Sequence, residues 1–132
     1  MSRITRLARG LALPTIPHVR TALLLICSNV FMTFAWYGHL TRERFKAAPL
    51  WIVVLGSWLI ALFEYCFQVP ANRLGAESGL TAAQLKIMQE VITLGVFVGF
   101  SLVFFREERI TWNIWVGFAL VLLAVFFVYH KW

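Results

Sequence analysis

Long apolar runs separated by short charged segments dominate the chain. Residues 21–41, 47–63, 91–105 and 110–130 contain no Asp, Glu, Lys or Arg. A helix that crosses a bilayer requires about 20 mostly apolar residues. The first and fourth runs reach this length by themselves. The second and third reach it only if Glu64, and Lys86 with Glu90, also lie within the membrane, so charged side chains are expected inside two of the spans.

Local signals set the boundaries of these helices. Pro70 disfavours helical backbone at Val69, so the second helix is expected to end there and to be followed by a polar loop. Thr81 with Gln84 three residues later forms a capping-box pattern, which predicts that the third helix begins near residue 82. The predicted spans are residues 20–41, 47–69, 82–105 and 110–130.

The loops between these spans are short, which forces neighbouring helices to be antiparallel. The pattern therefore predicts an all-α integral membrane protein, a compact four-helix bundle over residues 21–132 with both termini on one side of the membrane. Residues 1–20 contain arginines and no acid, and we interpret them as a basic tail at the membrane surface rather than as a removed targeting peptide.

Composition and charge agree with this fold class. Of the 132 residues, 61% are hydrophobic and 14% are charged, whereas a soluble domain averages about 45–50% and about 25%. This excludes an ordinary soluble enzyme. The net charge of +6 comes from basic residues at the ends of apolar runs, where they contact lipid headgroups, so the expected partner is the bilayer and not nucleic acid.

Orientation depends on which side carries more Lys and Arg. The side of the termini carries six outside the spans: Arg3, Arg6, Arg9, Arg20, Arg73 and Lys131. The other side carries five: Arg42, Arg44, Lys46, Arg106 and Arg109. The positive-inside rule therefore favours an N-terminus inside the cell by a margin of one residue.

Counting along the helices at about 1.5 Å per residue gives expected depths for the polar groups. Lys86 and Glu64 are each expected about 6–8 Å from the shared membrane face, and Asn29 and Glu90 about 12–14 Å. Three helices would then present polar groups at two matched depths. Together they are expected to line one cavity.

A carboxylate in hydrocarbon costs at least about 2.5 kcal/mol, so these acids require partners or protons. Lys86 and Glu90 are spaced as an i,i+4 pair, and the expected depth match offers Glu64 as a second partner for Lys86. With two acids and one embedded base, one carboxyl is expected to be protonated, as a coupled transporter requires. Alternatively, Lys86 neutralises the acids and fixes helix register. The candidate substrate- and proton-binding residues are Glu90, Glu64, Lys86, Asn29, Gln89, Gln68 and Trp36.

Other chemistry finds little support. Cys27 and Cys66 lie singly within apolar runs and the three histidines are scattered, so neither a metal site nor a cofactor is expected. No Ser or Cys nucleophile has an evident base, so we do not expect an enzyme. Trp36 ends the first span and fits either an aromatic belt at the interface or a box for a quaternary ammonium group.

Three segments resemble a family of short bacterial proteins placed in the drug/metabolite transporter superfamily: NVFMTFAWYGHL (29–40), FEYCFQVPANR (63–73) and AQLKIMQEVITL (83–94). The similarity covers about residues 21–130. It implies a four-helix, multi-pass protein of the bacterial inner membrane that forms a dimer, and by analogy a transporter.

The better-known four-helix relatives in that superfamily are the small multidrug resistance exporters, which exchange protons for organic cations through a Glu in the first helix. The first span here has Asn29 and no acid, so that mechanism does not transfer residue by residue. The nearly balanced basic charge is typical of an antiparallel dimer with dual topology.

These observations lead to a proton-coupled transporter of a small polar or cationic metabolite, with a homodimer forming the pathway because four helices alone enclose little space. Glu90 is the expected titrating group. Two alternatives remain open. One is a non-transporting membrane module that assembles with a larger complex through its polar residues. The other is translocation of a lipid-linked substrate.

Overall fold

The computed structural model describes residues 15–105 and 111–130, and in these ranges the chain is helical without strands. Four helices are long and apolar enough to cross a membrane, which confirms the predicted fold class. They are α2 (Thr15–Tyr37), α4 (Leu50–Glu77), α5 (Ala82–Phe104) and α6 (Trp112–Tyr129). A 3-10 turn, η1 (Gly38–Leu40), and a single helical turn, α3 (Glu43–Lys46), connect α2 to α4.

The start of α5 is set by the predicted capping box. The Thr81 hydroxyl accepts from the Gln84 backbone N–H at 3.2 Å, and the Gln84 side chain accepts from the Thr81 backbone N–H at 3.0 Å. Each side chain thus satisfies a backbone donor that the first turn of a helix leaves free. The helix begins at Ala82, as predicted.

The prediction that the second helix ends before Pro70 is wrong, because α4 continues through Pro70 to Glu77. A proline inside a helix lacks one backbone donor and is normally destabilising. Here the next two turns bury Ala71 and Gly75 against neighbouring helices, and this packing outweighs the loss. The helix ends at Glu77, and the turn that follows includes Gly79, whose φ of 93° suits a residue without a side chain.

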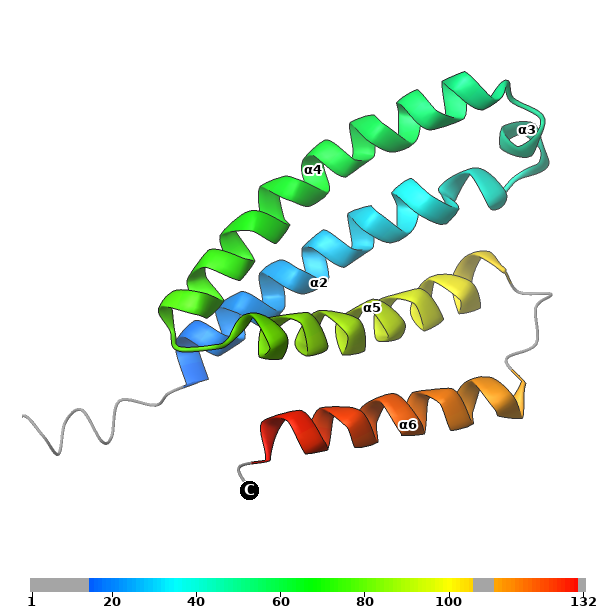
Figure 1. Ribbon diagram of the computed structural model, residues 1–132. Coiled ribbons are helices and arrows are strands. Elements are labelled where there is room, and N and C mark those ends of the chain that lie inside the picture. Colours follow the sequence, from blue (N-terminus) through cyan, green and yellow to red (C-terminus); the bar gives the residue numbers. More distant parts are fainter. Residues whose placement is uncertain (1–14, 106–110, 131–132) are drawn as a thin grey trace, which may run out of the picture.

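Helix α2 occupies the centre of the arrangement, with α4 on one side and α5 on the other, while α6 packs against α5 (Figure 1). Phe31 of α2 stacks on Phe63 and Phe67 of α4, with ring centroids 5.9 and 5.6 Å apart. Phe34 of α2 meets Phe100 and Phe104 of α5 edge-on. The aromatic contacts therefore fix α2 between its two neighbours.

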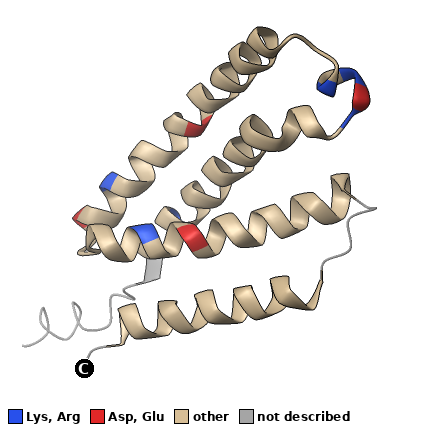
Figure 2. Cartoon of the chain, turned by 45° about the vertical axis from the view of Figure 1, so that its right-hand side comes forward, with Lys and Arg blue, Asp and Glu red and all other residues tan. Residues whose placement is uncertain are grey.

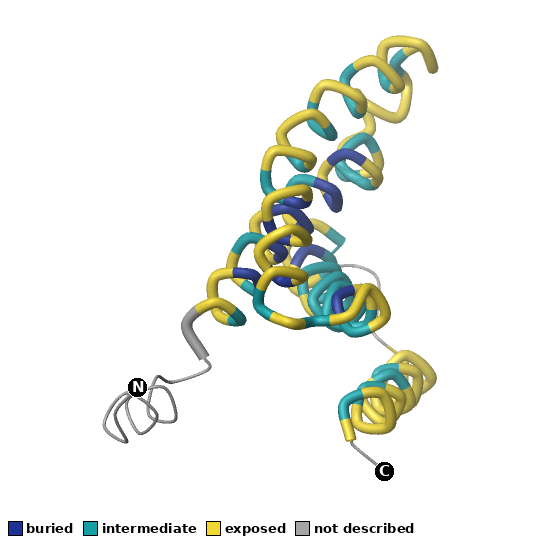
Figure 3. The backbone as a smooth tube through the Cα atoms, turned by 60° about the vertical axis from the view of Figure 1, so that its left-hand side comes forward, coloured by how far each residue is buried: buried dark blue, intermediate teal, exposed yellow. Residues whose placement is uncertain are grey.

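Burial follows the same arrangement (Figure 3). The buried residues of α2 are Thr21, Leu25, Ser28, Asn29, Met32, Thr33 and Ala35. Helix α6 has no buried residue. Apolar grooves of about 420 and 200 Å³ separate α6 from α5 around Gly95. A hydrogen bond of 2.7 Å from the Tyr129 hydroxyl to the Gln84 carbonyl holds its far end. Helix α6 is thus the least tightly packed of the four.

The chain ends and the connections between helices are divided between the two ends of the molecule. The start of α2 and the end of α6 lie on the same side of the molecule as the turn between α4 and α5 (Figure 1). The opposite end carries the charged connection around α3, and a few charged positions lie along α4 and α5 (Figure 2). Helix α2 begins five residues before the predicted start at residue 20, so part of the predicted tail is helical.

Candidate functional site

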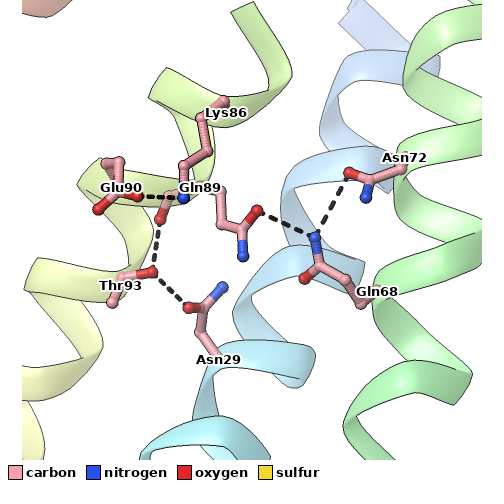
Figure 4. A network of polar contacts seen from close by, with 7 residues as sticks. All are labelled: Asn29, Gln68, Asn72, Lys86, Gln89, Glu90 and Thr93. Atoms are coloured by element: carbon pink, nitrogen blue, oxygen red, sulfur yellow. Dashed lines mark hydrogen bonds and ion pairs between the residues drawn. The ribbon is translucent and has the colours of Figure 1, made fainter. Parts of the chain in front are cut away.

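A group of neutral polar side chains joins α2, α4 and α5 within their apolar lengths (Figure 4). We call this group the amide cluster; its members are Ser28, Asn29, Gln68, Asn72, Gln89 and Thr93. Such groups are costly in hydrocarbon unless they are hydrogen-bonded, and in this cluster they bond mainly to one another.

Gln68 is the centre of the amide cluster. Its Oε1 accepts from the Ser28 hydroxyl of α2 at 2.8 Å, and its Nε2 donates to Gln89 Oε1 of α5 at 3.1 Å. A longer contact of 3.4 Å joins the same Nε2 to Asn72 Oδ1 one turn along α4. The side chain is buried, with 8% of the residue exposed. One amide therefore links the three helices.

Asn29 lies beside this centre and is fully buried. Its Nδ2 donates to the Leu25 carbonyl of α2 at 2.7 Å, and its Oδ1 accepts from the Thr93 hydroxyl of α5 at 2.5 Å. The Thr93 hydroxyl also lies 2.8 Å from the Gln89 carbonyl, so one hydroxyl hydrogen faces two acceptors. In Figure 4 the amide groups of Asn29, Gln68 and Gln89 point toward the same space between the helices.

The Lys86–Glu90 ion pair lies outside the amide cluster. The predicted i,i+4 pairing is confirmed, with Lys86 Nζ 2.5 Å from a Glu90 carboxylate oxygen. Both side chains are on the surface, 66% and 45% exposed. Successive residues of a helix differ by about 100° in direction, so Glu90 points to a different side of α5 from Gln89.

Glu64 has no hydrogen bond or ion pair in the part of the chain that the structure describes, and it is half-buried on α4. The expected depth match with Lys86 is wrong. The hydrogen bond between Gln68 and Gln89 shows that these two residues lie at the same depth. Glu64 is four residues before Gln68 on α4, farther from the turn between α4 and α5. Lys86 is three residues before Gln89 on α5, nearer to that turn. This separates them by about 10 Å along the helices. The expected depths take Val69 as the end of the second helix, but the helix extends eight residues further, to Glu77.

Trp36 is not part of the amide cluster. It lies seven residues beyond Asn29 along α2, is 58% exposed, and has a ring contact with Tyr37 at 6.4 Å. Of the seven predicted site residues, the structure thus brings together Asn29, Gln68 and Gln89, pairs Lys86 with Glu90, and leaves Glu64 and Trp36 apart.

Three members of the amide cluster were not predicted: Ser28, Asn72 and Thr93. Ser and Thr are common in membrane helices, so their presence alone carries little information. The useful signal is register, because antiparallel helices that pair residue 28 with residue 68 also place Thr21 against Gly75. Asn72 lies after Pro70, where the sequence predicts a loop, but the structure places it within α4.

No cluster of three metal-ligating side chains occurs among residues 15–105 and 111–130, and Cys27 and Cys66 are both exposed to the surroundings. The polar groups that do converge are amides and hydroxyls. Amides both donate and accept hydrogen bonds, as do hydroxyls, so this cluster is able to form hydrogen bonds with a polar group.

Comparison with known proteins relates the chain to a protein family. No curated protein and no solved structure matches the chain. A family described as "Putative member of DMT superfamily (DUF486)" matches residues 21–129, which include the four helices from the second turn of α2 onward. Four membrane-length helices with an internal polar cluster agree with a multi-pass membrane protein of a transporter superfamily. The chain belongs to the DUF486 family of the DMT superfamily.

Proposed function

We propose that this protein is a proton-coupled transporter of a small polar or cationic metabolite, and that the amide cluster binds the solute. The observation that carries the proposal is the convergence of amide and hydroxyl groups from three helices within their apolar lengths. Gln68 and Gln89 lie about 10–14 Å along their helices from the shared end, well inside a bilayer. In this proposal, a solute with hydrogen-bonding groups replaces the hydrogen bonds that the amides make to one another.

Proton coupling requires a group that gains and loses a proton during the cycle. Glu90 has a neutralising partner in Lys86, whereas Glu64 has none among the described residues. Glu64 is one turn from Gln68 on α4, so a solute at the amide cluster is close to it. We therefore assign the proton site to Glu64 and a supporting role to the Lys86–Glu90 pair. A cationic solute would replace the proton on Glu64, since both neutralise the same carboxylate.

The test uses purified protein in proteoliposomes that contain a pH-sensitive dye. A panel of amines, guanidinium compounds, amino acids, sugars and nucleobases is added outside, and solute-dependent proton movement is recorded. Glu64→Gln is expected to abolish that movement. Glu77→Gln is the matched control, because Glu77 is on the same helix but at its exposed end. Glu90→Gln is expected to reduce the rate without removing coupling.

Proton movement unchanged in Glu64→Gln would refute the assignment of that residue. If no member of the panel moves protons with folded wild-type protein, coupled transport of these solute classes is refuted. Thermal stability of each variant separates the alternatives. If the chain is instead a non-transporting membrane module held together by these residues, the variants Gln68→Leu and Glu64→Gln should unfold more readily than the wild type. A larger partner should then copurify from the membrane.

A further inference from the structure

A stripe of exposed side chains runs along the face of α4 that points away from α2. We call it the outer stripe; its members are Trp51, Leu55, Trp58, Leu62, Tyr65, Val69 and Asn72. The spacing alternates between four and three residues throughout. This spacing is the pattern by which one helix packs along another at a small left-handed angle.

Two members of the outer stripe carry polar atoms deep in the span. Tyr65 is 15 residues after Leu50 and 12 before Glu77, about 22 and 18 Å from the two ends of α4. Trp58 is eight residues after Leu50, about 12 Å from that end. Tyr and Trp normally lie at the membrane interface, where water or headgroups satisfy their polar atoms.

Neither polar atom has a partner within the described parts of the chain. Tyr65 is 61% exposed and Trp58 is 58% exposed, and no hydrogen bond from either ring is present there. The exposed face of α2 offers a contrast, since its residues Val19, Leu23, Ile26 and Val30 are aliphatic. A lipid-facing surface requires only that kind of side chain. A phenol and an indole at this depth call for a protein partner.

We infer that the outer stripe binds the outer stripe of a second copy of this chain, with Tyr65 at the symmetry axis. A phenol hydroxyl both donates and accepts, so two Tyr65 hydroxyls satisfy each other when they meet across a two-fold axis. Tyr65 is within two residues of the midpoint of α4, so both copies keep their apolar spans in the same bilayer.

The polar groups favour an antiparallel pair. Trp58 and Asn72 are each seven residues from Tyr65, on opposite sides, so an antiparallel copy brings each Trp58 level with the partner's Asn72. The indole N–H only donates, and the Asn72 amide oxygen has a second lone pair beyond its long contact with Gln68. A parallel copy would instead place two indole donors together and two Arg73 side chains near each other. The nearly equal Lys and Arg counts at the two ends permit insertion in both orientations.

Disulfide trapping in native membranes tests this interface. The full chain with Cys27→Ala and Cys66→Ala provides the background, and Tyr65→Cys is expected to form a disulfide-linked dimer on mild oxidation. Ile26→Cys on the aliphatic face of α2 is the matched control and should stay monomeric. Two differently tagged chains, one Trp58→Cys and one Asn72→Cys, are expected to form a mixed dimer when coexpressed.

Because cysteine at Tyr65 removes the proposed hydrogen bond, Tyr65→Phe provides a second measurement. It is expected to weaken self-association about threefold in a dilution series in liposomes, with unchanged thermal stability of the protomer. Absence of the Tyr65→Cys dimer, or cross-linking no greater than that of Ile26→Cys, overturns the interface. Self-linked dimers of Trp58→Cys and of Asn72→Cys without the mixed product overturn the antiparallel orientation. Association unaffected by Tyr65→Phe overturns the role of the hydroxyl.

Discussion

Gly75 offers the sharpest test of the packing, because three helices meet at this residue. A methyl group added there would lie 2.3 Å from Leu85 Cδ2 of α5 and 3.2 Å from Thr21 Cγ2 of α2. Real Cβ atoms do not approach other carbons to 2.3 Å, so Leu85 has to move. Leu85 is 7% exposed and Thr21 is fully buried, so neither side chain has open space on its free side.

The expected cost of Gly75→Ala follows from this crowding. Forcing an extra methyl group into a packed site typically costs about 1–3 kcal/mol. Replacing glycine by alanine in a helix gains about 1 kcal/mol, which partly hides that cost. Gly56→Ala removes this ambiguity. Gly56 lies in the same helix, and an added methyl group there meets no atom within 4 Å. We expect Gly75→Ala to be less stable than Gly56→Ala by about 1–3 kcal/mol.

Reversible unfolding in mixed micelles, followed by circular dichroism and by the fluorescence of the six tryptophans, provides the measurement. A double-mutant cycle then identifies the contact. Leu85→Ala opens the space that the new methyl group needs, so the two substitutions should couple favourably by about 0.5–3 kcal/mol. No such coupling is expected between Leu85→Ala and Gly56→Ala, since Gly56 has no neighbour within 4 Å.

Equal stabilities of Gly75→Ala and Gly56→Ala, within about 0.5 kcal/mol, would refute the reasoning. That result would mean that Gly75 is not enclosed by α2 and α5. It would also restore the expectation from the sequence that the residues after Pro70 form a loop, where an extra methyl group has room.

Three further predictions concern single polar contacts. Lys86→Gln should destabilise the protein in liposomes more than the double variant Lys86→Gln/Glu90→Gln, because the single change leaves a carboxylate unpaired in the span. Thr93→Val removes the hydroxyl bonded to Asn29 and should lower the free energy of unfolding by about 0.6–1.7 kcal/mol, with Thr111→Val at the exposed start of α6 as a neutral control. Tyr129→Phe removes the hydrogen bond between the end of α6 and α5, so hydrogen exchange should accelerate in α6 while α2 is unchanged.

The helices were largely predictable because charge-free length is a strong signal for membrane spans. Four such runs gave four helices, and the capping box located the first residue of α5. The end of α4 was not predictable from local rules. Pro70 has the same intrinsic effect in any helix, and only the burial of Ala71 and Gly75 against other helices explains why the chain stays helical there.

The site was predictable in composition but not in pairing. Asn29, Gln68 and Gln89 were selected because polar groups inside apolar spans are rare, and the structure brings these three together. Their contacts depend on depth, and an error of eight residues in the predicted end of α4 changes every depth that is measured from that end. For this reason Lys86 was matched with Glu64, which lies about 10 Å away along the helices.

The separation of neutral and charged groups bears on how this chain works in a membrane. Apart from Asn72, which is exposed on α4, the amide cluster lies between the helices of one protomer and its groups satisfy one another, so these contacts stabilise the fold without a partner. Lys86 and Glu90 neutralise each other on the surface of α5, whereas Glu64 and Tyr65 have no polar partner among the described residues. A single protomer therefore leaves the Glu64 carboxyl and the Tyr65 hydroxyl without a protein partner among the described residues. Under the proposed function, Glu64 binds a proton or a cationic solute, and under the proposed interface Tyr65 binds a second copy of the chain.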